Sequence, residues 1–344
     1  MSAEDEGPRK RPTINDIAAT AGVSKPTVSR VLNGHPDVSA TTRRRVQEVA
    51  AELGYVPSSG ARALSTGRHG ALGLLMPAFS WWGFNELQYG IAHEAEKRGL
   101  RLLVQALRPG DEAEREFVTR TLPTLPVDGL ILLMPEGMLR YVGDLARSGR
   151  PVVVVDDRGN RPGVPYVETT NREGVREAVA HLVAQGRRRI GFLAGQMGSA
   201  YARARFEGYL DGLREAGLPY LPELVSLSEE APVEPLPEDL DAVLDAEPDA
   251  VVAAWDEIAF AVMNAVHARG LRIPEDIAVI GFDDSPLARA VRPPLTTVHQ
   301  PCREMGEAAV RMLADAIEHG TGPANASVPT RLVIRESTGP LSTA

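Results

Sequence analysis

Aromatic and acidic side chains follow several short apolar segments of the chain. Asp156–Asp157, Trp255–Asp256 and Asp283–Asp284 each come directly after such a segment, and Phe79, Trp81 and Trp82 follow another. Tryptophan rings stack on the C–H faces of sugars, whereas carboxylates accept hydrogen bonds from hydroxyls. Because all three tryptophans of the chain gather in this way, a di- or oligosaccharide is favoured over a single hexose. A purine, whose base also stacks on tryptophan, is the alternative.

The same carboxylates could serve a glycosidase, which uses two facing acidic groups. Adjacent residues after a strand point in different directions, so neither Asp156–Asp157 nor Asp283–Asp284 is a facing pair by itself. The sequence has no nucleophile elbow, no phosphate-binding glycine-rich loop and no histidine pair at metal-ligand spacing. His299 is expected to pack or to line a pocket wall. We therefore expect neither an enzyme nor a bound cofactor or metal.

A second group of polar residues lies on one short helix near the N-terminus. Ser24 caps a predicted helix from Lys25 to Leu32, where a proline in the first turn is tolerated because first-turn amides have no intrahelical partner. The outward-facing residues of this helix are Lys25, Pro26, Thr27, Ser29 and Arg30. Short donors near a helix N-terminus, with an arginine further along, suit the reading of base edges in the major groove of DNA.

Two further helices must hold this one in place. Thr13 and Asp16 form a capping-box-like start to a helix that ends at Gly22, and Ser39 caps a third helix from Ala40 to Leu53. Apolar residues at helical spacing would fill a shared core: Ile14, Ile17, Ala18, Val23, Val28, Val31, Val46 and Val49. This pattern predicts a helix-turn-helix, with an ordinary three-helix bundle as the alternative.

From residue 70 onward, short apolar strands alternate with amphipathic helices. The expected strands are 71–76, 100–106, 129–134, 151–155, 189–194, 250–254 and 277–281, with a helix near 86–98. Apolar strands separated by helix-length segments are typical of parallel sheets covered on both faces. Ligands of such sheets bind beyond the carboxyl ends of the strands, which is where the aromatic and acidic residues lie.

Charge is distributed unevenly along the 344 residues. Residues 8–68 hold 10 Lys and Arg against 4 Asp and Glu, whereas residues 69–344 hold 27 against 39. A basic segment on an acidic body is expected when one end meets phosphates. The single cysteine excludes an internal disulfide, and no apolar run is long enough to span a membrane. Because the first dozen residues are polar, without a signal-peptide apolar region, we expect a cytoplasmic protein.

A continuous N-terminal segment resembles the headpiece signature of lactose-repressor-type (LacI/GalR) transcription regulators: TINDIAATAGVSKPTVSRVLNGHPDVSATTRRRVQEVAAELGYVPSSGARAL. The resemblance implies that Lys25, Pro26 and Arg30 occupy base-reading positions. It also implies a set of residues placed to meet phosphates, namely Thr13, Ser24, Thr27, Ser29, Asn33, Thr42 and Arg43.

The resemblance also implies a hinge that becomes helical only on the operator and inserts a leucine into the minor groove. Leu64 matches that leucine, Ala61 matches a small residue beside it, and Arg62 lies on the same segment. A short stretch with Pro57, two serines and Gly60 is too weak to be a helix alone, so it would order only on DNA. Gly60 departs from the bulkier residue usual in the family. A plain linker is the alternative.

The rest of the chain resembles the family in the segments HLVAQGRRRIGFLAG, RARFEGYLDGL, IPEDIAVIGFDDSPLARAVRPPLTTVHQP and VIRES. This implies two α/β lobes of periplasmic-binding-protein type that close on an effector. Gln300 and Cys302 would then lie at the crossover strand behind the pocket. Two segments depart from the family, Ser80-Trp-Trp-Gly-Phe84 and Trp255-Asp256. The candidate effector-binding residues are Phe79, Trp81, Trp82, Asp156, Asn171, Arg205, Trp255, Asp256, Asp283 and Gln300.

The expected fold is an all-α helix-turn-helix headpiece with a hinge helix, joined to an α/β effector domain of two doubly wound lobes. The expected domains are a tail (1–11), headpiece (12–56), hinge (57–68), effector-binding and dimerisation domain (69–338) and tail (339–344). Lobe 1 would comprise about 69–170 and 301–329, and lobe 2 about 171–300 and 330–338.

The leading hypothesis is a sugar-released repressor that acts as a homodimer on a palindromic operator, without membrane contact. A dimer is expected because no apolar heptads follow Ser337. A corepressed regulator of opposite sign is the alternative. A transport binding protein is disfavoured, because the chain has a headpiece and no signal peptide.

Overall fold

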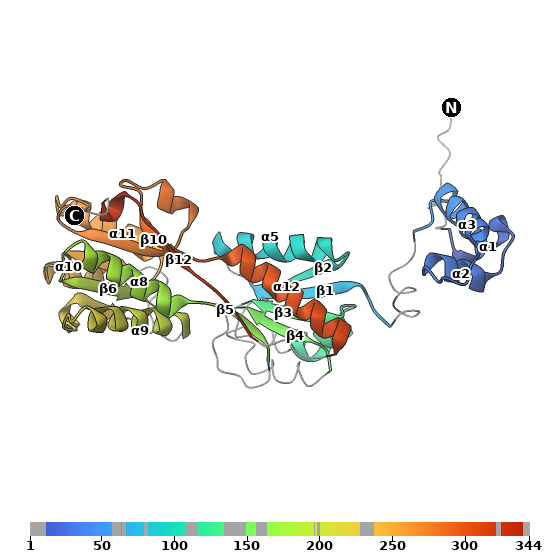
Figure 1. Cartoon of the computed structure of the whole chain (residues 1–344), viewed down its shortest axis with the longest axis horizontal. Helices are drawn as coiled ribbons and strands as arrows, with labels where there is room; N and C mark the ends of the chain where they lie inside the picture. The colour runs from blue at the N-terminus through green and yellow to red at the C-terminus, as the bar shows by residue number, and fades with distance from the viewer. Residues whose placement is uncertain are drawn as a thin grey trace, which may run out of the picture. The chain divides into compact units, whose positions relative to one another are not determined.

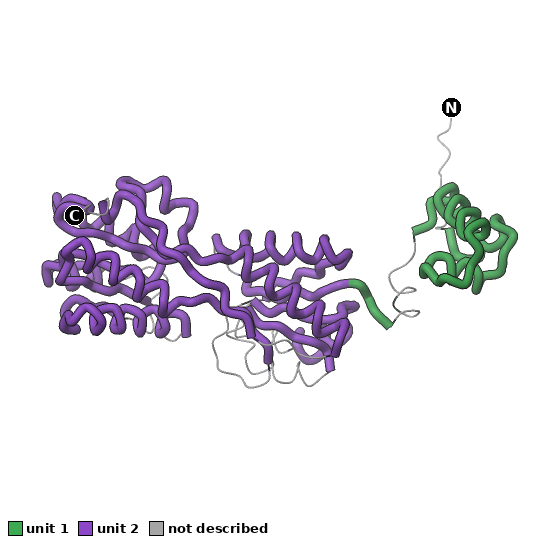
Figure 2. The backbone as a smooth tube through the Cα atoms, in the orientation of Figure 1, with its two compact units in different colours: residues 1–70 green, residues 71–344 purple. Residues whose placement is uncertain are grey.

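The computed structural model of the chain describes residues 12–56, 63, 67–78, 82–107, 116–133, 149–155, 164–195, 197, 200–227, 237–320 and 325–339. Contacts within the chain divide it into two compact units, residues 1–70 and 71–344 (Figure 2). Among the described residues, no helix is long and apolar enough to cross a membrane.

The first unit holds the helices α1 (Ile14–Ala21), α2 (Lys25–Leu32) and α3 (Ala40–Glu52) (Figure 1). Each helix begins after a hydroxyl side chain that accepts a hydrogen bond from a first-turn amide: Thr13, Ser24 and Ser39 respectively. Their inner faces bury a common core of Ile17, Val28, Val31, Val46, Val49 and Ala50. This arrangement confirms the predicted helix-turn-helix.

The second unit contains two six-stranded sheets. The first sheet is parallel throughout, in the order β11-β5-β4-β3-β1-β2. Its strands are β1 (Ala71–Pro77), β2 (Arg101–Leu107), β3 (Gly129–Leu133), β4 (Val152–Val155), β5 (Tyr166–Thr169) and β11 (Ala326–Val328). In β3, Leu130 and Leu132 join one apolar cluster, whereas Ile131 and Leu133 join another. Both faces of this sheet are therefore buried, as its unbroken apolar strands predict.

The second sheet has the order β12-β10-β9-β8-β6-β7, and only β12 runs antiparallel to its neighbour. Its strands are β6 (Ile190–Ala194), β7 (Val225–Leu227), β8 (Ala250–Ala253), β9 (Ala278–Asp283), β10 (Thr296–His299) and β12 (Arg331–Val333).

The α-helices of the second unit pack beside these sheets (Figure 1). Those within the described residues are α5 (Trp82–Lys97), α8 (Asn171–Ala184), α9 (Ala200–Glu215), α10 (Pro237–Asp245), α11 (Asp256–Ala268) and α12 (Cys302–His319). Helices α5 and α12 pack together on the first sheet, and α8 packs on α9 and on the second. Short 3-10 turns span Leu122–Thr124, Pro222–Leu224, Pro286–Arg289 and Glu336–Thr338, and a π-turn spans Phe117–Thr121.

The chain passes between the two sheets three times, from β5 to α8, from β10 to α12 and from β11 to β12. The first and third crossings are joined directly. The hydroxyls of Thr170 and Thr330 lie 2.9 Å apart, and the Thr330 amide donates to Thr170 Oγ1 at 2.8 Å. Asn171 directly follows the first crossing as the first residue of α8, and Gln300 lies on the second crossing, between β10 and α12.

Several elements differ from the sequence-based expectations. Strands β5, β7, β10, β11 and β12 were not predicted, because three or four residues of mixed polarity carry almost no periodic signal. The helix expected near 86–98 begins at Trp82, so this tryptophan lies on a helix. Cys302, expected at the crossover strand, is the buried first residue of α12, at the end of the crossing from β10.

Helix pairs in both lobes depend on glycine at their closest approach. A Cβ on Gly90 of α5 would lie 2.1 Å from the Arg303 carbonyl oxygen of α12. In the other lobe, a Cβ on Gly208 of α9 would lie 2.2 Å from the Arg172 carbonyl oxygen of α8. These carbonyls are backbone atoms, so a larger residue would have to separate the helices.

We expect Gly90→Ala to lower the free energy of unfolding by about 1–3 kcal/mol, although alanine is the better helix former, because the added methyl overpacks the contact. Urea denaturation at fixed protein concentration measures this. Asn85→Ala, at an exposed site of the same helix, is the control and should stay within about 0.5 kcal/mol of the wild type. A stabilising effect of Gly90→Ala would contradict the observed closeness of α5 and α12.

Candidate functional site

Helix α2 presents its polar residues on the side opposite the core. Lys25, Pro26 and Arg30 are exposed, whereas Thr27 and Ser29 are half-buried. Val28 and Val31 occupy the inner face and are buried. The Ser24 hydroxyl accepts from the Thr27 amide at 3.3 Å and lies 2.8 Å from the Thr27 hydroxyl. The helix thus offers two cations and small hydroxyls on one rigid surface, which suits contact with a DNA groove.

The residues predicted to meet phosphates mostly lie at helix ends. Thr13 and Ser24 cap α1 and α2, and Asn33 is the C-cap of α2. Thr42 lies in the first turn of α3, with its hydroxyl 2.9 Å from that of Ser39. Arg43 donates to the His35 carbonyl at 2.5 Å, which ties α3 to the preceding loop. Amides at helix N-termini attract phosphate oxygens, which is consistent with phosphate contacts at these positions. The contacts themselves stay predictions.

Some predicted site residues lie outside the described part of the chain. These are the hinge residues Ala61, Arg62 and Leu64, and the effector candidates Phe79, Trp81 and Asp156.

The described effector candidates gather around the buried guanidinium of Arg205, on the second turn of α9 and 3% exposed. Its Nε donates to Asn171 Oδ1 at 2.8 Å, and its Nη1 donates to the Ala254 carbonyl at 2.6 Å. Its Nη2 donates to Gln300 Oε1 at 3.0 Å and lies 3.6 Å from Asp283 Oδ1. The arginine cluster is defined here as Arg205 with Asn171, Ala254, Asp283 and Gln300. The partners of Arg205 lie at the start of α8 and at the carboxyl ends of β8, β9 and β10.

Aromatic rings border the arginine cluster. The Arg205 guanidinium lies over the Phe282 ring, 3.6 Å from its centroid, and 5.4 Å from the Tyr201 centroid. Tyr201 in turn makes an edge contact with Trp255, at 6.4 Å between centroids. Trp255 is 5% exposed and also belongs to the core of the second lobe. Trp82 begins α5 in the first lobe, where it is partly buried against the core cluster that α5 and α12 share, and its contact with an effector stays a prediction.

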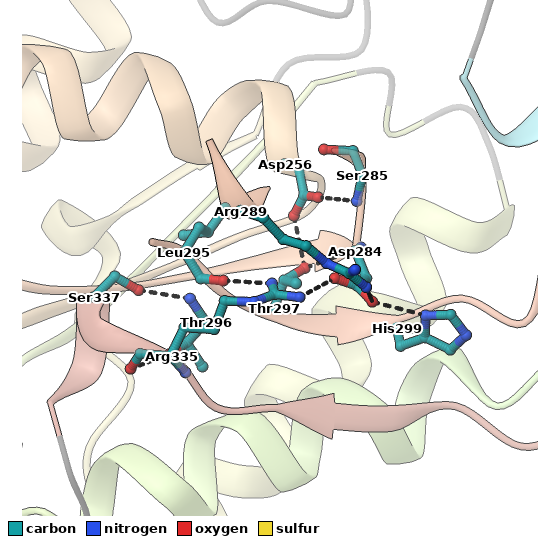
Figure 3. Close-up of polar contacts among 10 residues, drawn as sticks. All are labelled: Asp256, Asp284, Ser285, Arg289, Leu295, Thr296, Thr297, His299, Arg335 and Ser337. Atoms are coloured by element: carbon teal, nitrogen blue, oxygen red, sulfur yellow. Dashed lines mark hydrogen bonds and ion pairs between the residues drawn. The ribbon is translucent and has the colours of Figure 1, made fainter. Parts of the chain in front are cut away.

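Asp256 is an anchor beneath this site rather than one of its walls. Its side chain is 0% exposed, and both carboxylate oxygens are used. Thr297 Oγ1 donates to its Oδ1 at 2.6 Å, and the Ser285 amide donates to its Oδ2 at 2.7 Å. These contacts are drawn in Figure 3. The expectation that Asp256 contacts the effector is therefore corrected: it joins α11 to β10 and to the turn after β9.

The adjacent residues Asp283 and Asp284 face different partners. Asp283 faces Arg205, whereas Asp284 is hydrogen-bonded to His299 Nδ1 at 3.0 Å and to Arg335 (Figure 3). The expectation that adjacent carboxylates point in different directions is thus confirmed for Asp283 and Asp284. His299, expected to pack or to line a pocket wall, is hydrogen-bonded to the Asp284 carboxylate. Among the described residues, no group of three or more His, Cys, Asp or Glu could hold a metal ion.

Sequence reasoning missed Tyr201, Phe282 and Arg335. A signal existed for the first two, because Tyr201 is four residues before Arg205 on one helix and Phe282 directly precedes Asp283. Arg335 carried no such signal. It reaches Asp284 from 51 residues away in the sequence, a distance that only the fold closes.

Burial raises the pKa of Asp256 to about 7, against the opposing effect of the hydrogen bonds from Thr297 and Ser285. The native state therefore keeps a proton that the unfolded chain releases above its ordinary pKa of about 4. The stability contributed by this group is complete below pH 4. It is lost as the pH rises towards 7, by at most about 1.4 kcal/mol per pH unit.

We expect the difference in unfolding free energy between wild type and Asp256→Asn to shrink as the pH is raised from 4 to 7, since asparagine does not titrate. Urea denaturation at several pH values measures it. Asp276→Asn is the control: Arg272 lowers the pKa of Asp276 to about 2, so its difference should stay constant over this range. A constant difference for Asp256→Asn would show that Asp256 is ionised throughout.

Comparison with known proteins supports both halves of this description. A family model of bacterial regulatory proteins, lacI family, matches residues 13–58, and a periplasmic binding protein-like domain matches residues 179–338. The HTH-type transcriptional regulator CelR of Thermobifida fusca is 36% identical, over 96% of this chain and 99% of that protein.

Two solved structures are similar over nearly the whole chain. A complex of the transcriptional regulator CelR with cellobiose has a TM-score of 0.68 and 33% identity, covering 95% of this chain and 100% of that one. The Lac repressor dimer bound to operator and the anti-inducer ONPF has a TM-score of 0.83 and 28% identity, covering 96% and 100%. The chain thus belongs to the lacI family of bacterial regulatory proteins and is a DNA-binding transcription regulator.

Proposed function

We propose that this regulator is a dimeric repressor of carbohydrate-utilisation genes that a di- or oligosaccharide releases from a palindromic operator. The observation that carries the proposal is the arginine cluster with its aromatic border, at the carboxyl ends of strands in the second sheet. No cofactor is part of the proposal.

The chemistry of the cluster supports a ligand rich in hydroxyls. A guanidinium, a carboxylate and two amides, from Arg205, Asp283, Asn171 and Gln300, provide directed donors and acceptors within a few ångströms. Tyr201 and Trp255 add aromatic faces of the kind that sugar rings pack against. A similar regulator, CelR, has been solved in complex with cellobiose, which makes a disaccharide the first effector to test.

The position of the cluster supports its use as a switch. Asn171 begins α8 just after the first crossing, and Gln300 follows β10 just before the second. A sugar held by these two amides would favour one arrangement of the crossings over another. A ligand can shift such an equilibrium only by its difference in affinity for the two arrangements. Because Asn171 and Gln300 lie at the crossings, a rearrangement of the crossings would change how well both amides contact the ligand.

The DNA side of the proposal rests on α2 and on charge. Lys25 and Arg30 are exposed on one helix. This helix lies within residues 8–68, which hold 10 Lys and Arg against 4 Asp and Glu. A similar protein, the Lac repressor, has been solved as a dimer bound to its operator. Two copies of this headpiece would place two recognition helices on the half-sites of a palindrome.

We expect cellobiose to change the tryptophan emission of the purified full chain in a saturable manner, whereas glucose, hypoxanthine and guanine should not. Arg205→Lys should weaken cellobiose binding about 10–100-fold, because lysine cannot reproduce the planar fork of donors. Gln300→Ala, a milder change, should weaken it in the same direction. Arg269→Lys, which alters a surface arginine bound to Asp241 and Asp245, is the control. Saturation by a purine alone would replace the sugar with a nucleobase effector.

We expect Arg30→Ala to cost about 1–3 kcal/mol of binding to an operator selected from a random duplex library, the scale of a good base contact. Binding to random DNA should change much less, so the discrimination between the two falls. Arg43→Ala should instead weaken both by similar factors, as loss of a phosphate contact does. Fluorescence anisotropy at one fixed salt concentration measures all four affinities. Unchanged discrimination in Arg30→Ala would remove this residue from base reading.

A further inference from the structure

The turn that follows β9 adopts a backbone conformation that side chains with a Cβ rarely take. Asp283 has a φ of 118° and Asp284 a φ of 58°. Such conformations cost free energy and persist only where the surroundings hold them, often at ligand-binding positions. The turn also carries Asp283, the carboxylate of the arginine cluster. What holds this turn therefore bears on the geometry of the effector site.

Hydrogen bonds from other segments hold the backbone of this turn. The Ser285 amide donates to Asp256 at 2.7 Å, and the Asp284 amide donates to Thr297 Oγ1 at 3.3 Å. The Gln300 amide donates to the Asp283 carbonyl at 3.3 Å. These contacts fix the main chain, but none of them uses the carboxylate of Asp284.

The Asp284 carboxylate is surrounded by basic side chains that are not part of the arginine cluster (Figure 3). It accepts hydrogen bonds from Arg335 Nη2 and from His299 Nδ1, the latter at 3.0 Å, and lies 3.7 Å from Arg289 Nη2. The Asp284 side chain is only 3% exposed. Burial acts to raise its pKa, but the hydrogen bonds from His299 and Arg335 outweigh this and leave the pKa lowered. The carboxylate is thus a buried charge that depends on its partners.

Two of these partners belong to parts of the second lobe that adjoin the crossings. His299 ends β10, directly before the second crossing, and Arg335 follows β12, after the third. Arg335 is itself anchored, because its Nη1 donates to the Leu295 carbonyl at 2.8 Å and its amide donates to Thr296 Oγ1 at 2.8 Å. Asp284 consequently joins the turn to both segments.

We propose that Asp284 is a positioning residue of the effector site. Through Arg335 and His299 it holds the 283–285 turn so that Asp283 faces Arg205, and it ties that turn to the second and third crossings. The inference rests on the proposed effector role of the arginine cluster. A change in the crossings then alters the placement of Asp283, and loss of the Asp284 charge loosens the site without removing any group that touches the ligand.

Three variants test the ion pair. Asp284→Asn keeps the shape and tolerates the left-handed backbone, Arg335→Gln removes the opposite charge, and the third variant combines both changes. The control is the exposed ion pair Arg272–Asp276, which precedes the other end of β9. It is removed in the same three ways, as Asp276→Asn, Arg272→Gln and their combination.

The first measurement needs no ligand. Hydrogen–deuterium exchange of the peptide spanning residues 281–287, in the full chain without effector, should be faster in all three Asp284 and Arg335 variants. It should stay at the wild-type rate in the control variants. Unchanged exchange in the Asp284 and Arg335 variants overturns the proposal, whatever the protein binds.

The second measurement is cellobiose titration followed by tryptophan emission. Asp284→Asn and Arg335→Gln should each raise the dissociation constant about tenfold, and the double variant should do no worse than either, because both remove one interaction. Additive effects, or equal losses in the control variants, would reduce Asp284 to a general stability role and overturn the proposal. A wild type that binds no sugar overturns the proposed function alone, and the exchange measurement then still decides the role of Asp284.

Discussion

The buried positive charge of Arg205 is the constraint around which the second lobe is arranged. A guanidinium removed from water is tolerated only if acceptors and a counter-charge surround it. Here Asn171, the Ala254 carbonyl, Gln300 and Asp283 meet this demand, and each comes from a different segment of the chain. Satisfying one side chain therefore brings together the start of α8, the ends of β8, β9 and β10, and two of the three crossings between the sheets.

Three buried aspartates near this charge keep their places by different means. Asp283 lies beside the guanidinium, Asp284 is held by a second arginine and a histidine, and Asp256 receives only neutral donors. The pKa values follow these environments, since that of Asp256 is raised and that of Asp284 is lowered. Similar residues at neighbouring strand ends thus differ in what surrounds them: Asp283 faces a guanidinium, Asp284 is paired with Arg335 and His299, and Asp256 is buried among neutral donors.

The two units of the chain are organised over different ranges of sequence. In the headpiece, Thr13, Ser24 and Ser39 each bond an amide three residues ahead, and the core residues recur at helical spacing. In the arginine cluster, Arg205 reaches residues 34, 49 and 95 positions away. Short-range bonds can be recognised from a local pattern, which explains why the three headpiece helices follow from their own sequence, whereas Arg205, Asn171 and Gln300 entered the prediction only through the family resemblance.

By itself, the sequence determined the elements whose signal is local: the capped helices, the long apolar strands and the parallel sheets that those strands imply. It also indicated that Trp255 and Asp283 follow strands, whereas Arg205 was expected at the site only from the family resemblance. Only the tertiary structure decided that Asp256 is an anchor, that Trp82 is partly buried against a core, that the Tyr201 ring borders Arg205 and that Arg335 pairs with Asp284. The direction of a side chain and the pairing of its charge depend on segments that only folding brings together. A local sequence pattern therefore cannot predict them.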